Sequence, residues 1–384
     1  MTGMMLAVLR NCRTSGSAMR VAYDEIALDN FLKLATKVSR DQPVVISKFI
    51  EGAKEVEADG VSDGENCLIG AVIEHVENAG VHSGDATMTI PPQTLTTDIL
   101  KKVEDATQKI VKALKIKGPY NIQYLVKDGE VSVIECNLRA SRSMPFVSKT
   151  RGVNLIELAT LAMLDKKFNV AIQTCKLPPI NHVGVKVPQF SFMRLSGADP
   201  VLGVEMLSTG EVACLGENFA DAFSKALQSA EFRMPPKDGA VLITVGGDEP
   251  KRRAAALAKA FEEMGFKIYA TWHTAEVMKA EGVKSVQTLY KVKEATAAPN
   301  NILDYLQDHK IDLVINVPIP NKRTTYTDVL TDGYIIRRQA VEFNVPVIVN
   351  LELASALVRV LQQHNGTTIR SLNEYMDALP WKLW

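Results

Sequence analysis

The sequence predicts an α+β region followed by an α/β domain built on a doubly wound parallel sheet. Up to about residue 150, short β-rich runs lie on either side of one long helical segment, a grouping typical of α+β folds. After residue 237, apolar β-rich runs alternate strictly with helical segments, which indicates a parallel sheet covered on both faces. The segment "FRMPPKDG" separates the two patterns, so we expect domains at residues 1–236 and 237–384.

The first region contains β-rich runs that we expect to pair as antiparallel strands, at residues 43–50, 54–64 and 67–76. A long helix is predicted over 97–115 because Leu100, Val103, Ile110, Val111 and Leu114 recur at helical spacing. Two alternating strands follow at 120–127 and 130–137, joined by an Asp-Gly dipeptide that suits a hairpin turn. Residues 152–164 predict a further helix.

In the second region we expect strands at 240–247, 266–272, 285–290, 312–318 and 346–351. Helical segments separate them, at 250–265, 301–310, 334–343 and 352–364. The first of these helices carries Pro250 in its opening turn and ends at Gly265, the positions that these residues favour in helices.

Composition excludes some partners and favours a compartment. The 44 Lys and Arg residues balance 44 Asp and Glu residues, so no global field favours nucleic acid or an anionic membrane. Five scattered cysteines without a C-x-x-C pair indicate a reducing compartment, neither a disulfide framework nor a zinc site. We therefore expect a cytoplasmic location, favoured over a mitochondrial one, although the first 20 residues contain arginine and no acid, as transit peptides do.

The stretch "SVIECNLRASRS", 132–143, places polar side chains directly after an apolar run. Residues two apart share a strand face, so Glu135 and Asn137 point the same way, and Gln123 on the preceding strand is expected to join them. Carboxylate and amide oxygens suit Mg²⁺. Arg139 and Arg142 add forked donors for phosphate or carboxylate oxygens. A solvated face with incidental salt bridges is the alternative interpretation.

The loop "GVHSGDAT", 80–87, supplies a possible partner for that face. Its two glycines, a histidine and a serine could present backbone N–H groups to a phosphate or a ribose. Ordinary turns use the same residues, so the loop alone does not decide between the two interpretations.

Several segments in the same order resemble one family. The segments "SGSAM" (15–19), "ISKFIEGAKEVEADG" (46–60), "EHVENAGVHSGDAT" (74–87), "YNIQYLVKDGEVSVIECNLRASRSMPFVSKT" (120–150) and "ADPVLGVEMLSTGEVACLG" (198–216) resemble the second ATP-grasp unit of the carbamoyl phosphate synthetase large subunit. Residues 239–384 resemble its regulatory domain, of the methylglyoxal-synthase-like type. The resemblance implies a partial ATP-grasp domain followed by a methylglyoxal-synthase-like domain.

The resemblance also implies an activity and its site residues. In that family this unit phosphorylates carbamate with ATP and Mg²⁺ (or Mn²⁺), giving carbamoyl phosphate and ADP. Positions that match the metal ligands are Gln123, Glu135 and Asn137, and those that match the phosphoryl-transfer arginines are Arg139 and Arg142. Positions that match nucleotide contacts are Arg10, Lys48, Ile50, Glu55, Gly80, Val81, His82 and Ser83, together with Gln123 and Glu135. The flanks of Arg10, "LRNCRT", depart from the family pattern.

The family resemblance also sets an expectation about the N-terminus. An intact large subunit carries two synthetase units, and the portion before "SGSAM" should supply a sheet that covers one side of the nucleotide. We expect that sheet to be absent, so that a truncated start explains the N-terminus better than a transit peptide does. We also expect that the chain alone does not make carbamoyl phosphate, and a catalytically inactive fragment that retains only effector binding is the alternative function.

The second domain carries a convergent set of cationic and hydroxyl-bearing residues where strands of an open α/β sheet end. They are Lys251, Thr271, Thr274, Lys291, Asn316, Lys322 and Arg323. In the resembling family, uridine nucleotides bind at positions matching Lys251, Thr271, Thr274 and Lys291. The N-acetylglutamate type instead has further asparagines, where this chain shows Ile319 and Gly333. We therefore predict a uridine nucleotide or phosphoribosyl effector.

Two further expectations follow from the resemblance. A glutamine amidotransferase subunit or domain would be the partner that supplies the nitrogen. Methylglyoxal synthase activity is the enzymatic alternative for the second domain, but the glycine-rich phosphate loop expected after its second strand is replaced by "ATWHTA". The resemblance therefore favours regulation over that activity.

Overall fold

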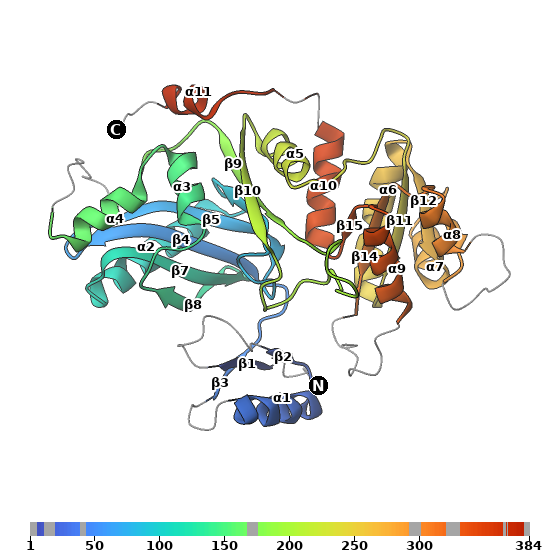
Figure 1. The fold of residues 1–384 in the computed structure, drawn as a ribbon, viewed down its shortest axis with the longest axis horizontal. Helices are drawn as coiled ribbons and strands as arrows, with labels where there is room; N and C mark the ends of the chain where they lie inside the picture. Colours follow the sequence, from blue (N-terminus) through green and yellow to red (C-terminus); the bar gives the residue numbers. More distant parts are fainter. Residues whose placement is uncertain are drawn as a thin grey trace.

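The structure is a computed structural model that describes residues 6–10, 20–38, 44–166, 176–291, 301–319, 331–363, 366 and 368–379. For residues 6–10, 20, 34–38 and 44 only the backbone is described. The described residues form three sheets with eleven helices around them (Figure 1). No helix within these ranges is both long and apolar enough to cross a membrane.

The smallest sheet has three antiparallel strands in the order β2-β1-β3: β1 (Leu6–Arg10), β2 (Arg20–Ala22) and β3 (Val44–Lys48). Helix α1 (Glu25–Val38) contacts β1 and β2, and the unit lies apart from the main sheet in Figure 1. The sequence predicted β3 but neither β1 nor α1. Strand β1 precedes "SGSAM" and is the central strand of this sheet, and the expected absence of the larger portion before "SGSAM" stays a prediction.

The second sheet has seven strands in the order β10-β9-β6-β5-β4-β7-β8, and every neighbouring pair is antiparallel. The strands are β4 (Lys54–Asp63), β5 (Cys67–Asn78), β6 (Met88–Ile90), β7 (Lys117–Lys127), β8 (Glu130–Asn137), β9 (Val183–Gln189) and β10 (Gly210–Gly216). The hairpin between β7 and β8 turns at Asp128 and Gly129, which have φ of 50° and 82°. The predicted hairpin is therefore confirmed.

Alternation along β4 sends its side chains to two different layers. Val56 and Ala58 pack with α2 (Thr97–Ala113) on one face. Val61 packs on the other face with α3 (Met144–Arg151) and α4 (Leu155–Met163). Helices α2 and α4 were predicted, whereas α3 was not. Helices α3 and α4 cover only the Val61 end of this second face. The rest of the face along β4 is therefore not covered by these helices.

The third sheet has five parallel strands in the order β13-β12-β11-β14-β15. They are β11 (Ala240–Val245), β12 (Lys267–Thr271), β13 (Gln287–Leu289), β14 (Leu313–Val317) and β15 (Val347–Ile348). The helices are α6 (Asp248–Glu263), α7 (Trp272–Ala280), α8 (Ile302–Gln307), α9 (Asp332–Glu342) and α10 (Leu351–Gln363), of which α7 was not predicted. The order reverses at β11, so the predicted doubly wound sheet is confirmed.

Helix α10 joins the two larger sheets through one continuous hydrophobic core. It contacts α5 (Phe219–Ser229) and β5 on one side and α6 on the other (Figure 1). Buried residues from both regions belong to one cluster, among them Val185, Phe223, Val241, Phe261 and Leu357. The boundary between 236 and 237 stays a prediction, because the core continues across it.

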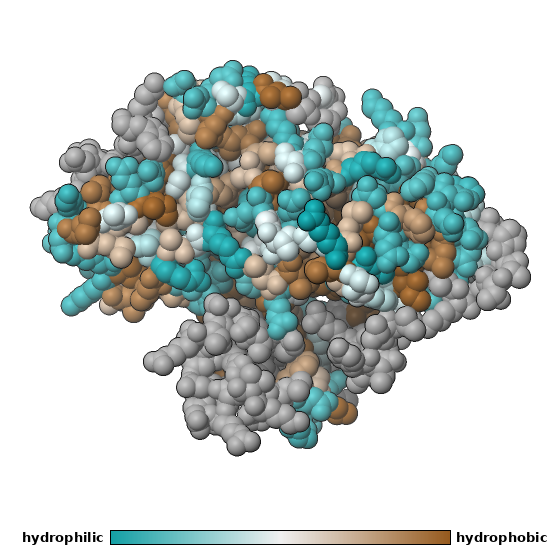
Figure 2. All heavy atoms as spheres, viewed as in Figure 1, coloured by the Kyte–Doolittle hydropathy of each residue, from teal (hydrophilic) through white to brown (hydrophobic). Residues whose placement is uncertain are grey.

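The C-terminal helix α11 (Leu372–Asp377) returns to the first region. Its buried Tyr375 packs edge-to-face on His182, and the Nζ of Lys225 donates to the Tyr375 hydroxyl at 3.3 Å. Over the described residues of the face in Figure 2, hydrophobic residues form small patches among hydrophilic ones. Among the described residues, no disulfide joins Cys67, Cys136 or Cys214.

Candidate functional site

A polar grid occupies the end of the second sheet face that α3 and α4 leave uncovered. Strand β4 turns Glu55, Glu57 and Asp59 to the face that Val61 shares, and all three are buried. Directly opposite residues on antiparallel strands point to the same side. On β7, Gln123 lies opposite Glu57 and Asn121 opposite Asp59; on β8, Glu135 lies opposite Gln123 and Asn137 opposite Asn121.

The predicted metal ligands Gln123, Glu135 and Asn137 are therefore neighbours. Asn137 Nδ2 donates to Glu135 Oε1 at 2.8 Å and to Asn121 Oδ1 at 3.3 Å. Gln123 and Asn137 are half-buried, whereas Glu135 is exposed at the sheet edge. The structure brings the three together, and their role as metal ligands stays a prediction.

The two predicted arginines stand at the edge of this grid. Arg139 and Arg142 follow β8 and are exposed. Arg139 Nη2 donates to Asn137 Oδ1 at 3.3 Å, and Arg142 contacts the sulfur of Met206. Neither forms an ion pair with a carboxylate in the part of the chain that the structure describes. Both guanidinium groups therefore keep donors for an incoming anion.

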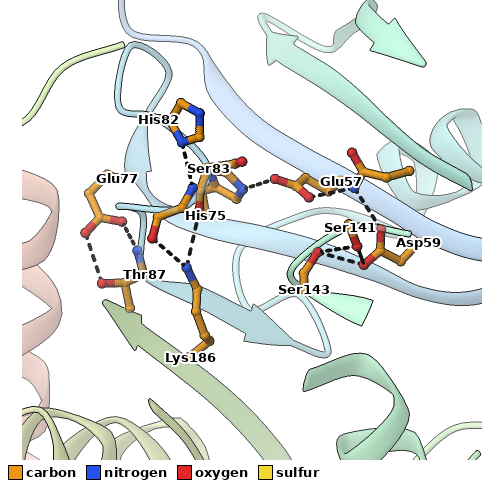
Figure 3. Close-up of polar contacts among 12 residues, drawn as sticks. Glu57, Asp59, His75, Glu77, His82, Ser83, Thr87, Ser141, Ser143 and Lys186 are labelled. Carbon is orange, nitrogen blue, oxygen red and sulfur yellow. Dashed lines mark hydrogen bonds and ion pairs between the residues drawn. The ribbon is translucent and has the colours of Figure 1, made fainter. Parts of the chain in front are cut away.

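Sequence reasoning missed the buried network beneath the predicted ligands (Figure 3). His75 Nε2 lies 3.0 Å from Glu57 Oε1. Asn121 Nδ2 donates to Glu57 Oε2 at 2.8 Å and to Asp59 Oδ1 at 2.7 Å. The Ser141 and Ser143 hydroxyls both donate to Asp59 Oδ2 at 2.7 Å. The alternating acids in "EVEAD" were a signal for this set, since alternation puts all three acids on one face.

Electrostatics in this network favour a cation. Burial raises the pKa of Glu55 from 4.5 to about 7, with His75 opposing the rise and the Glu57 and Glu135 carboxylates adding to it. Burial and the Glu57 charge raise the pKa of Asp59 from 3.8 to about 6, against the donors Ser141, Ser143 and Asn121. Crowded carboxylates that resist ionisation are relieved by a divalent ion.

One pair in the network favours its charged form. Burial alone would raise the Glu57 pKa, but the hydrogen bond and charge of His75 outweigh it and lower that pKa. Burial opposes charge on His75 as well, yet Glu55 and Glu57 raise its pKa. Ligand atoms of Glu55, Glu57 and His75 lie within 4.8 Å of one another, a spacing that could hold a metal ion.

The donor set fits magnesium. Carboxylate and amide oxygens converge from three adjacent strands, and Mg²⁺ prefers such hard oxygen ligands. Glu135, Gln123 and Asn137 lie at the open edge, where an ion would keep positions for water and phosphate oxygens. The deeper acids lie behind them and supply negative potential.

The loop after β5 lies beside this grid and is anchored at several points. His82 N donates to Gly203 O at 2.8 Å, and the Asp85 carboxylate accepts from Leu207 N at 2.8 Å and Ser208 N at 2.9 Å. Gly80 has φ of 109°, a left-handed conformation that glycine adopts without strain. Burial lowers the pKa of His82, against the charge of Asp85, which favours a neutral ring there.

The remaining predicted nucleotide contacts are spread around the loop. Glu55, at the start of β4, belongs to the grid. Lys48 ends β3 and is exposed, and Ile50 is half-buried just after it. Arg10 ends β1, opposite Val44, but its side chain lies outside the described part. The structure thus brings Glu55 to the metal-ligand candidates, whereas Lys48 and Ile50 lie on the connection to the small sheet.

The predicted effector residues meet in a second location. Lys251, Thr271, Thr274, Lys291 and Asn316 all line one cavity of about 980 Å³ at the carboxyl ends of the parallel strands. Thr271 Oγ1 donates to Thr274 Oγ1 at 3.4 Å, and both threonines are buried. Lys322 and Arg323 lie outside the described residues. The same cavity reaches Gly80 and Val81, with Val21 and Tyr23 of the small sheet on its wall.

A buried arginine connects this cavity to the loop after β5. Arg337 on α9 donates to Asn316 Oδ1 at 2.6 Å and holds both oxygens of Asp199 at 2.7 and 2.6 Å. Asp199 belongs to the segment 197–208. Farther along this segment, Gly203 O accepts a hydrogen bond from His82 N, and the backbone N–H groups of Leu207 and Ser208 donate to the Asp85 carboxylate. In the sequence Arg337 was only part of a predicted helix, and its two partners come from distant segments.

Family models match both regions. Residues 7–167 match the model described as "Carbamoyl-phosphate synthase L chain, ATP binding domain", and residues 253–349 match the model described as "MGS-like domain". The first match begins within β1, in accordance with the small sheet found above. The predicted fold class, an ATP-grasp region followed by a methylglyoxal-synthase-like domain, is confirmed.

Curated relatives match nearly the whole chain. The chain is 44% identical over 352 residues to "Multifunctional protein URA2" of Saccharomyces cerevisiae, which covers 91% of the chain and 16% of the relative. It is 45% identical to "Multifunctional protein pyr1-3" of Dictyostelium discoideum (92% and 16%) and 42% identical to "Carbamoyl-phosphate synthase [ammonia], mitochondrial" of Homo sapiens (94% and 24%). The chain thus spans about a sixth to a quarter of their lengths.

Among solved structures, a biotin carboxylase complex from Campylobacter jejuni aligns with a TM-score of 0.48 and 15% identity, over 60% of each chain. The assignment rests on the two family models and on the relatives. The chain belongs to the carbamoyl-phosphate synthetase large-chain family, of which it carries an ATP-binding domain and an MGS-like domain.

Proposed function

We propose that the polar grid and the loop after β5 form a carbamate-phosphorylating site that uses ATP and Mg²⁺. The observation that carries this proposal is the convergence of Glu135, Gln123 and Asn137 in front of the buried acids of β4. In the reaction a carbamate oxygen attacks the γ-phosphorus of ATP, the bond from that phosphorus to the β–γ bridging oxygen breaks, and ADP leaves. The products are carbamoyl phosphate and ADP.

The residues of this chain supply positioning and charge. Glu135, Gln123 and Asn137 would hold Mg²⁺, which neutralises phosphate charge when it is bound. Arg139 and Arg142 stand beside them with free donors and would stabilise the equatorial oxygens of the transferring phosphoryl group. Asn137 accepts from Arg139, so one arginine is aligned with the ligand set before substrate binds. Mn²⁺ is a further candidate for the same oxygen ligands.

Glu57 and His75 have a different role in this proposal. Their ion pair is buried behind the ligands, so it maintains the negative potential and the strand spacing without touching the nucleotide. Asn121 joins that pair to Asp59, which Ser141 and Ser143 hold in turn. These serines begin the turn that leads from β8 to α3, so the network also fixes the segment that carries Arg142.

A MgATP-binding measurement tests the proposal. Isothermal calorimetry with MgATP should show saturable binding by the unaltered chain, and chelation of the metal should weaken it by roughly 10-fold or more. Glu135→Ala should weaken binding by a comparable factor, whereas Glu130→Ala, at the exposed start of the same strand, should not. Equal MgATP affinities for the two variants would refute the assignment.

The reverse reaction tests the chemistry separately from binding. In a synthetase that contains this chain, ADP and carbamoyl phosphate should yield ATP, detected by luciferase, and Arg142→Lys should lower the rate more than it changes nucleotide affinity. MgATP binding without any turnover in either direction would instead support a non-catalytic chain that retains only ligand sensing.

The second part of the proposal concerns the cavity of the parallel sheet, which we assign to a uridine nucleotide or phosphoribosyl effector. Two lysines and two buried threonines offer charge and hydroxyl donors for a phosphate, and Thr271 and Thr274 lie where the carboxyl end of β12 meets α7. Calorimetry should show UMP binding that Thr274→Val weakens. Binding of N-acetylglutamate with no UMP binding would refute this assignment.

Two further expectations accompany the proposed activity. A glutamine amidotransferase, as a subunit or a fused domain, would supply nitrogen to the larger synthetase, and we place the protein in the cytoplasm. Co-purification of a glutaminase with the native polypeptide tests the first of these, and fractionation tests the second.

A further inference from the structure

Lys186 is a buried cation that the proposed chemistry does not use. It lies on β9 opposite Met88 of β6, and its side chain is 2% exposed. Figure 3 shows it reaching from β9 toward the loop after β5, between Glu77 and His75. A lysine with so little solvent contact needs partners that justify its burial.

Those partners are backbone carbonyls of the nucleotide loop. Lys186 Nζ donates to Ser83 O at 3.2 Å and to Gly84 O at 3.3 Å. The nearest carboxylate oxygen, on Glu211, is 3.9 Å away and lies beyond hydrogen-bond distance. Burial lowers the pKa of Lys186, and the charges of Glu211, Glu57, Glu77 and Asp85 around the ammonium group oppose that shift.

This choice of partners sets the direction of two successive peptide groups. Their carbonyl oxygens point inward to the ammonium group, and their N–H groups are used within the loop: Gly84 N donates to His82 Nδ1 at 3.0 Å and Asp85 N donates to His82 O at 2.8 Å. Without an inward cation, the Ser83 carbonyl could rotate outward. An outward carbonyl would present negative charge to the triphosphate.

The rest of the loop is fixed by contacts that do not control the Ser83 carbonyl. His82 N is held by Gly203 O, and Glu77 accepts from Thr87 N and Oγ1 at 2.7 and 3.0 Å. Ser208 Oγ also donates to Gly84 O at 3.2 Å, so Ser83 O is the carbonyl that relies on Lys186. If charge balance alone set its position, the ammonium group would contact a carboxylate. The nearest carboxylate oxygen, on Glu211, is instead 3.9 Å away.

We propose that Lys186 is a positioning residue that holds the carbonyls of Ser83 and Gly84 away from bound nucleotide and so sets the loop for the phosphates of ATP. This inference rests on the proposed MgATP site. It concerns a residue that touches the loop and no reacting atom. We expect that removing the charge of Lys186 lowers the affinity for nucleotide and that arginine at the same position restores it.

The test compares three variants of the full chain in MgATP calorimetry. Lys186→Met removes the charge with little change of shape, and the dissociation constant should rise by roughly 10- to 100-fold, the range expected for loss of charge-assisted hydrogen bonds. Lys186→Arg keeps a donor and should recover most of the affinity. Lys225→Met is the matched control, because Lys225 is also shielded and bonded, to Asp221 and Tyr375, away from the loop. It should bind as the unaltered chain does.

The outcomes separate this inference from the proposed function. If the unaltered chain binds no MgATP, the proposed function fails and this inference fails with it. If the unaltered chain binds and Lys186→Met binds equally well, only the role of Lys186 is refuted. A loss shared by Lys186→Arg and by Lys225→Met would also refute it, since that pattern indicates general destabilisation.

A second measurement covers a variant that fails to fold. The double variant Lys186→Met with Glu211→Gln removes one negative charge together with the lysine, and circular dichroism reports whether the chain is folded. Hydrogen exchange of the 80–87 peptide should become faster in this variant while exchange in β11 stays unchanged. Unchanged exchange in 80–87 would refute the positioning role.

Discussion

Replacing Glu55 with glutamine should stabilise the protein in a pH-dependent way. Burial raises the Glu55 pKa from 4.5 to about 7, so the folded state binds this proton more tightly than the unfolded state does. Stability from this group is therefore fully present below about pH 4.5 and is lost as the pH rises to about 7. The whole difference corresponds to about 3 kcal/mol of unfolding free energy above both values.

The Glu55→Gln variant removes that loss because glutamine stays neutral. Its neighbours Glu57, Asp59 and His75 share the titration, so we expect the variant to exceed the unaltered chain by about 1–3 kcal/mol near pH 8 and by close to zero near pH 5. Urea unfolding followed by circular dichroism at several pH values measures the difference. Glu130→Gln controls for the change in net charge.

Two results would refute the reasoning about Glu55. One is an equal stability difference at both ends of the pH range, and the other is a variant less stable than the unaltered chain near pH 8. The same substitution should weaken MgATP binding, since Glu55 belongs to the proposed site. Replacing a buried charged group that serves a binding site commonly raises the stability of the protein and weakens the site.

Three further perturbations test the framework around the site. Gly60→Ala should destabilise the chain by about 2–3 kcal/mol, because a Cβ there would lie 2.2 Å from Leu68 O and from Tyr120 Oη; Gly210→Ala, with room for a Cβ, is the control for thermal unfolding. Asn121→Ala should cost about 1–3 kcal/mol in urea unfolding, since Glu57 and Asp59 lose their shared donor. A double-mutant cycle of Arg337→Met and Asp199→Leu should give a coupling of about 1–3 kcal/mol; additive effects would contradict the ion pair.

Much of the fold followed from local patterns. Apolar runs alternating with helical segments determined the parallel sheet, and the ends of its strands are where Lys251, Thr271 and Asn316 meet, because all strands of such a sheet end at one edge. The Asp-Gly turn set the β7–β8 hairpin and so placed Gln123 opposite Glu135. Helices α1, α3, α5, α7 and α11 were not predicted; of these, α3, α7 and α11 have only six to nine residues, too few for a clear helical period.

The sequence by itself determined which residue types could bind metal, phosphate and effector, because strand alternation and turn chemistry act over a few residues. Only the tertiary structure decided which of them have buried partners. Lys186 reaches Ser83, 103 residues before it, and Arg337 joins Asn316 to Asp199, which lies 138 residues before Arg337. Burial and pairing over such distances depend on packing of whole layers, and no local pattern encodes them.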